Sequence, residues 1–120
     1  MRIALIGFAV AATIAAMPAQ AQDASEAASV AIGQGAYSDA ERTLQRELRV
    51  HPGRPELMLN LAAVYARTGR AADARSLYNR VLTQDEVLMD LSADRTAGSH
   101  AVARTGLRRL EPVQYTARAN

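Results

Sequence analysis

The stretch that decides the fold is residues 55–82, PELMLNLAAVYARTGRAADARSLYNRVL. Pro55 can open a helix, because its fixed φ suits a first turn whose N–H groups have no partner inside the helix. Apolar side chains then recur at helical spacing until Gly69, which can adopt the left-handed conformation that ends a helix. A second apolar stripe follows, made of Ala74, Leu77, Tyr78, Val81 and Leu82. The stretch therefore predicts two antiparallel helices, at 55–68 and 71–83.

The same pattern occurs a second time, 34 residues earlier in the chain. Equivalent positions carry identical residues: Ala28 and Ala62, Val30 and Val64, Gly35 and Gly69, Asp39 and Asp73, Ala40 and Ala74, Arg46 and Arg80, Leu48 and Leu82. The earlier copy predicts helices at 23–33 and 37–50, and Pro52-Gly53 breaks the chain between the copies. Where the helices of a pair cross, only a small side chain lets the two axes come close, so we expect the repeated alanines at the crossings.

This 34-residue period resembles the tetratricopeptide repeat (TPR). The residues that carry the resemblance are Met58, Leu61, Ala62, Tyr65, Gly69, Ala74 and Tyr78. Met58 stands where the family usually has an aromatic residue, and Glu86 stands where it usually has a proline. The resemblance implies an all-α fold, so we predict two TPR-like antiparallel helical hairpins in residues 22–85 that form a short α-solenoid. It also implies that the hairpins bind another protein or a peptide.

The C-terminal extension, residues 86–120, does not continue the repeat. Apolar residues alternate over 87–91, which predicts a short extended segment there. Residues 92–98 are polar and turn-like. Ser99 is then expected to cap a helix at 100–110.

Two hairpins are fewer than the about three repeats that a solenoid normally needs for stability. The open face of the second hairpin therefore has to be covered. The helix at 100–110 carries an apolar stripe of Ala103, Leu107 and Leu110, and we expect it to cap that face within the chain. Pairing of the face with another subunit is the alternative. Residues 113–120 are expected to fray.

The first residues show the three parts of a secretory signal peptide. Arg2 is followed by an uncharged, mostly apolar run from Ile3 to Met17, and then by the small-residue ending Pro18-Ala19-Gln20-Ala21. We expect residues 1–21 to be a signal peptide that is cleaved after Ala21. An uncleaved anchor is the alternative, but a spanning helix needs about 20 apolar residues, and Pro18 ends this run earlier. The protein is therefore expected in the periplasm, or secreted, with no membrane span after cleavage.

Composition argues against several classes of function. The chain of 120 residues has no Cys and a net charge of +2. The lack of Cys excludes disulfides, thiolate zinc sites and a cysteine nucleophile. The basic residues form no stripe with interleaved aromatics, which argues against nucleic acid as a partner. The two histidines, His51 and His100, have no acidic residues at metal-ligand spacing, so we expect both at the surface. We predict no metal, no cofactor and no catalytic residue.

The candidate binding surface follows from the resemblance, which implies that the first helix of each hairpin lines a concave face. The second copy contributes Glu56, Leu59, Asn60, Ala63 and Arg67, and the first copy contributes Ser25, Glu26, Ser29 and Ile32. Asn60 stands where carboxylate-clamp TPRs hold a peptide backbone, but Ser25 replaces a basic residue that such a clamp needs. We therefore expect a groove of mixed polarity for an extended or helical peptide.

Three functions are open on the sequence. The one we predict is a non-catalytic interaction or scaffold module of the cell envelope, which binds a partner segment on the concave face. The second is a structural protein that self-associates weakly through its open hairpin face. The third is a small-molecule binder or an enzyme.

The first prediction concerns the alanine at a helix crossing. We expect the substitution Ala74→Leu to lower the free energy of unfolding by ~1–3 kcal/mol, because the added methyl groups overpack the contact between the two helices. Thermal unfolding followed by circular dichroism measures the effect. An unchanged melting temperature would show that the proposed hairpin register is wrong.

Overall fold

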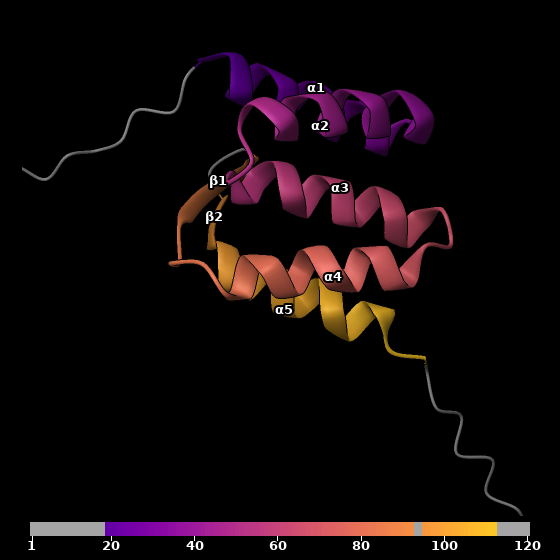
Figure 1. Cartoon of the computed structure of the whole chain (residues 1–120), viewed down its shortest axis with the longest axis vertical. Coiled ribbons are helices and arrows are strands. Elements are labelled where there is room, and N and C mark those ends of the chain that lie inside the picture. Colours follow the sequence, from indigo (N-terminus) through magenta and orange to yellow (C-terminus); the bar gives the residue numbers. More distant parts are fainter. Residues whose placement is uncertain (1–18, 93–94, 113–120) are drawn as a thin grey trace, which may run out of the picture.

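Five helices and a two-stranded sheet make up the part of the chain that the computed structural model describes, residues 19–92 and 95–112. The elements in chain order are α1 (Ala19–Gly33), α2 (Tyr37–Val50), α3 (Pro55–Arg67), α4 (Ala71–Leu82), β1 (Leu88–Ser92), β2 (Arg95–Gly98) and α5 (Ser99–Leu110). The helices form two antiparallel hairpins, α1–α2 and α3–α4, with α5 against the second of them (Figure 1). The predicted class, an all-α stack of two hairpins with a C-terminal helix, is confirmed.

Each hairpin turns at a glycine with a positive φ, Gly35 at 78° and Gly69 at 77°. Side chains with a Cβ rarely adopt this conformation, which ends a helix in the left-handed manner. The turn of the second hairpin is closed by the backbone N–H of Arg70, which donates to the carbonyl of Tyr65 at 2.8 Å. The turn of the first is closed by the N–H of Ala36 and the carbonyl of Ala31, also at 2.8 Å. Both turns therefore end their helices where the sequence indicates.

The N-terminal helix begins earlier than predicted. α1 starts at Ala19 and not at residue 23, so the expected cleavage point after Ala21 lies within its first turn. The apolar run from Ile3 to Met17 and the expected frayed tail at 113–120 lie outside the described residues. The signal peptide and its cleavage stay predictions.

Alanines stand at the contacts between helices, as the repeat implies. The alanines that are almost completely buried come from all five helices: Ala28, Ala40, Ala62, Ala74 and Ala103. They share one core with larger side chains, of which Leu44, Met58 and Val64 have no exposed surface. Because alanine adds little bulk at a crossing, the larger residues on either side can interdigitate and fill the core densely.

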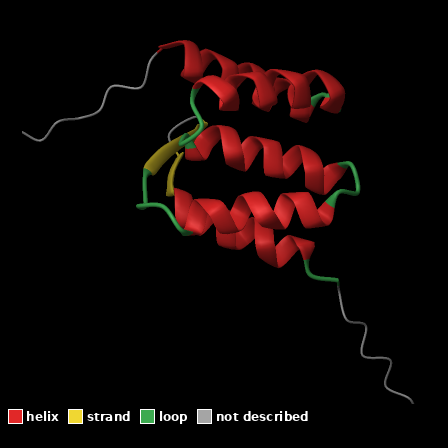
Figure 2. Cartoon of the chain, in the orientation of Figure 1, coloured by secondary structure: helices red, strands yellow, loops and turns green. Residues whose placement is uncertain are grey.

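The segment after α4 differs from the prediction. β1 covers most of the expected extended segment, but residues 95–98, expected as part of a turn, form a second strand (Figure 2). The two strands are antiparallel, and Leu88 is paired with Gly98. Met89 points into the core at 5% exposure. Arg95–Gly98 lacks the apolar alternation that marks a strand, so only its pairing with β1 reveals it.

Ser99 does not cap α5 but is its first residue, with Gly98 in the capping position. The Ser99 side chain is completely buried. Its hydroxyl accepts a hydrogen bond from the backbone N–H of Val87 at 2.9 Å, and its own N–H donates to the Val87 carbonyl at 2.8 Å. This double contact ties the start of β1 to the start of α5, and it replaces the expected cap.

α5 covers the second hairpin within the same chain. It begins at the same end of the stack as α3 and packs against both α3 and α4 (Figure 1). Gly106 makes a close approach possible, because a Cβ at this position would overlap three atoms of the Tyr78 ring on α4. The partly buried Leu107 and Leu110 complete the contact with the core. The helix is therefore the intrachain cap that the shortage of repeats requires.

The second prediction tests this close approach. In an ordinary helix, Gly106→Ala would stabilise by roughly 1 kcal/mol through helix propensity. Here we expect a net loss of stability of ~1–2 kcal/mol, because the new Cβ pushes against a buried aromatic ring. The matched control is Gly53→Ala, since a Cβ there meets no atom within 4 Å. Thermal unfolding of both variants gives the comparison, and a stabilised Gly106→Ala protein would contradict the packing.

Candidate functional site

The structure joins three of the predicted surface residues at the seam between α1 and α3. The Asn60 amide donates to the Ser25 hydroxyl at 2.9 Å and to the Ser25 carbonyl at 3.3 Å. The Ser29 hydroxyl donates to the same carbonyl at 2.9 Å. Asn60 therefore links the two hairpins, a structural task that the sequence analysis did not foresee. Its amide is only half-buried, so part of it still faces solvent.

The other residues predicted for this surface differ in how exposed they are to solvent. Leu59 belongs to the core with 6% exposure, so its side chain serves packing and not an open surface. Arg67 is exposed, and Ala63 is half-exposed between Asn60 and Arg67 along α3. Glu56 is half-buried, and its Oε2 has no hydrogen-bond partner among the described residues. Hereafter, Ser25, Ser29, Asn60, Ala63 and Arg67 are called the α1–α3 face, and their binding role stays a prediction.

Two arginines stand at the end of this face where α3 and α5 finish. Both Arg67 on α3 and Arg109 on α5 act electrostatically on the hydroxyl of Tyr78. Burial raises the pKa of the Tyr78 phenol above its ordinary value of about 10, and the positive charges of Arg109 and Arg67 partly offset the rise. The cap helix thus brings a second positive charge near the Tyr78 hydroxyl, beside that of Arg67.

A groove lies between α2 and α4, with α3 as its floor, and it has a volume of about 400 Å³. Its lining residues are Gln45, Leu48 and Arg49 from α2, Leu61 and Tyr65 from α3, and Asp73, Ser76, Leu77 and Arg80 from α4. All of the wall residues come from the second helix of a hairpin. The surface predicted from the sequence lies on the first helices, so this groove was not among the predicted sites.

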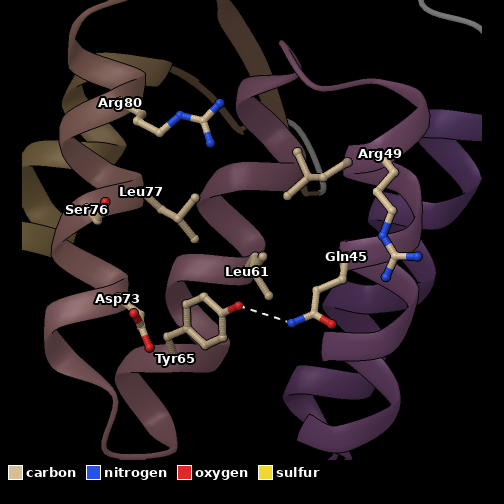
Figure 3. Close-up of a pocket in the computed structure, with 9 residues that line it drawn as sticks. Gln45, Arg49, Leu61, Tyr65, Asp73, Ser76, Leu77 and Arg80 are labelled. Atoms are coloured by element: carbon tan, nitrogen blue, oxygen red, sulfur yellow. Dashed lines mark hydrogen bonds between the residues drawn. The ribbon is translucent and has the colours of Figure 1, made fainter.

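A polar network closes one end of the groove. The Arg70 guanidinium contacts Glu41 at 2.6 Å and Asp73 at 3.2 Å, and it lies 4.1 Å from the centre of the Tyr65 ring. Gln45 donates to the Tyr65 hydroxyl at 3.2 Å (Figure 3) and to Glu41 at 3.1 Å. The contact with Glu41 raises the pKa of Arg70 above its ordinary value. The network joins α2, α3 and the start of α4.

The other end of the groove carries two arginines from different helices. Figure 3 shows Arg80 on α4 at this end, and Arg49 on α2 one turn beyond Gln45, with its side chain running along α2 back toward Gln45. Neither guanidinium forms an ion pair within the part of the chain that the structure describes. The groove therefore has one arginine between two carboxylates at one end and two arginines toward the other.

The two histidines were expected at the surface, away from any metal site. His51 and His100 are both half-buried, so each is partly at the surface. The Nε2 of His100 also lies 2.7 Å from the carbonyl oxygen of Gln84, a contact within the chain that spacing does not indicate. Residues 19–92 and 95–112 contain no group of three or more His, Asp or Glu that could hold a metal ion. No helix in these ranges is long and apolar enough to cross a membrane.

Comparison with known proteins agrees with the geometry of the hairpins. A family model described as the tetratricopeptide repeat matches residues 25–87. No curated protein and no solved structure gives a significant match. Since the family model covers more than half of the chain, the protein belongs to the tetratricopeptide repeat family. The match ends before β1, so the strand pair and α5 lie outside the matched repeat.

Membership defines the function at a coarse level. Tetratricopeptide repeats are generally protein–protein interaction modules, and the family is typically not enzymatic. The chemistry of both surfaces fits this class, because they consist of hydrogen-bonding and charged side chains around apolar contacts. The protein is therefore, in outline, a protein-binding scaffold.

The third prediction follows from the raised pKa of Tyr78. An unfolded tyrosine loses its proton near pH 10 and the buried one at higher pH, so alkali favours the unfolded state. The contribution of Tyr78 to stability is complete below pH 10 and is lost as the pH rises toward its folded pKa. In urea unfolding, Tyr78→Phe should show a smaller loss of stability between pH 8 and pH ~11 than the original protein. Equal losses of stability in the two proteins would contradict the raised pKa of Tyr78. Between pH 7 and pH 8 the Tyr78 hydroxyl should make no difference to how the stability of the two proteins changes.

Proposed function

We propose that the protein is a non-catalytic interaction module of the cell envelope that binds a segment of a partner protein on its α1–α3 face. The observation that carries the proposal is the hydrogen-bonded seam of Asn60, Ser25 and Ser29. It holds the first helices of both hairpins in register. A partner segment can then contact side chains of both helices without first having to order them.

The α1–α3 face suits a peptide of mixed polarity. Asn60, Ala63 and Arg67 follow one another at helical spacing on α3, and Ser29 lies exposed on α1. An amide and a hydroxyl can bond to a peptide backbone, a small side chain allows close approach, and a guanidinium binds a carboxylate. Leu59 is left out of the proposed contact because it is buried. A face of this size implies modest affinity.

The envelope location rests on the first residues of the sequence. The positive Arg2, the apolar run to Met17 and the small-residue ending at Ala21 support export with cleavage. Release from the periplasm is the alternative destination.

Self-association is the second candidate function, and one observation favours it. The strand β1 exposes large apolar side chains, Leu88 at 73% and Leu91 at 45%. An exposed apolar strand at the edge of a sheet can pair with a second copy. Size-exclusion chromatography with light scattering separates the two candidates, since a monomer at micromolar concentration excludes self-association as the main function.

The fourth prediction tests the α1–α3 face. The purified protein should capture a partner from envelope extract, and the double variant Ser29→Arg/Arg67→Glu should lose most of it, because it adds bulk and reverses a charge on the face. The matched control is Arg75→Glu, an exposed arginine of α4 that lies outside this face. Asn60 is left unchanged, since its loss would also remove the link to Ser25. Equal capture by both variants would refute the proposed face.

A further inference from the structure

We propose that the groove between α2 and α4 is a second docking surface, which binds an acidic segment of a partner protein. An apolar side chain of the segment lies over the floor of the groove, and carboxylates of the segment pair with Arg49 and Arg80. The inference goes beyond the proposed function, which uses the α1–α3 face and not the second helices of the hairpins.

The floor of the groove supplies the apolar contact. Leu61 and Tyr65 of α3 are buried, and Leu48 and Leu77 of the walls are half-buried (Figure 3). A volume of about 400 Å³ lies in the lower range of ligand sites and accommodates a few side chains. Because the groove is shallow and open to solvent, it suits a chain segment that lies across it better than an enclosed small molecule.

The charged side chains of the groove favour a segment that carries negative charge. At the end beside Tyr65, the positive charge of Arg70 is already paired with both Glu41 and Asp73, and the two carboxylates outnumber it. Arg49 and Arg80 make no such pair among the described residues. Guanidinium groups bind carboxylates through charge-assisted, often bidentate hydrogen bonds. A segment with acidic residues beside an apolar one therefore complements both parts of the groove.

The same charges argue against the other anionic partners. A nucleic-acid strand or an anionic membrane presents closely spaced negative charges along the whole contact. Only one end of this groove is positive, and Glu41 and Asp73 stand at the other end. An acidic protein segment can place its carboxylates at the positive end alone.

The walls of the groove are already held in place by contacts within the chain. Gln45 bonds to Tyr65, and Arg70 lies over the same ring, so α2, α3 and the start of α4 are joined in the absence of a ligand. Walls that are already ordered lose little entropy on binding. Arg49 and Arg80 also lie in the last turns of their helices, where a positive charge interacts favourably with the helix dipole and so stabilises the helix. A test must therefore measure folding as well as binding.

The experiment selects dodecamer peptides from a random display library on the purified protein and measures the enriched peptides by fluorescence anisotropy. We expect enriched peptides that combine Asp or Glu with Leu or Phe, and whose affinity falls as salt is added. The double variant Arg49→Glu/Arg80→Glu should bind them about 10-fold more weakly or worse. Arg75→Glu, on the same helix as Arg80 but outside the groove, should bind them normally.

The outcomes separate this groove from the α1–α3 face. The Ser29→Arg/Arg67→Glu variant should keep its affinity for the acidic peptides, whatever happens to its capture of envelope partners. Circular dichroism shows whether the charge-reversed variant is folded, and Arg49→Gln/Arg80→Gln replaces it if it is not. The inference is overturned if no acidic peptides are enriched, if they bind the groove variants as well as the original protein, or if the Arg67 variant loses them equally.

Discussion

The close crossing of neighbouring helices is the constraint on which the rest of this structure depends. Two helices can approach closely only where the side chain at the contact is small, and Ala28, Ala40, Ala62 and Ala74 supply that side chain in the two hairpins. A short solenoid with few aromatic residues has little area to bury per residue, so dense packing must replace bulk. The repeated alanines thus explain both the hairpins and their position in the stack.

The shortage of repeats explains the C-terminal part. Two hairpins leave an apolar face open, and the chain covers it with α5, which approaches α4 closely at Gly106. The strand pair between α4 and α5 orients this helix, since Ser99 bonds to the backbone of Val87 in both directions. The family match ends before this segment, so the cap stands in the place of a third repeat without matching the repeat pattern. The cap also brings the positive charge of Arg109 near the Tyr78 hydroxyl.

The two surfaces differ in how far the sequence predicts the residues that form them. The α1–α3 face could be named residue by residue, because helical spacing and the TPR resemblance indicate which side of a first helix points away from its partner. Even so, Leu59 is buried and Asn60 is bonded to Ser25, and neither follows from spacing alone. The groove was missed, because Gln45, Tyr65 and Arg80 come from three helices whose distances depend on how the hairpins pack.

By itself the sequence determined the local structure: four helices from apolar periodicity, turns at Gly35 and Gly69, and a repeat that names the family. The helices and turns depend on neighbours a few residues apart, and the repeat on identical residues at a constant spacing of 34, so a linear pattern reveals them. Tertiary structure alone decided that residues 95–98 form a strand, that Ser99 is buried, and that a groove opens between α2 and α4. Each of these depends on how one segment pairs or packs with another. A strand without apolar alternation, or a groove between separate helices, has no signature within any one segment.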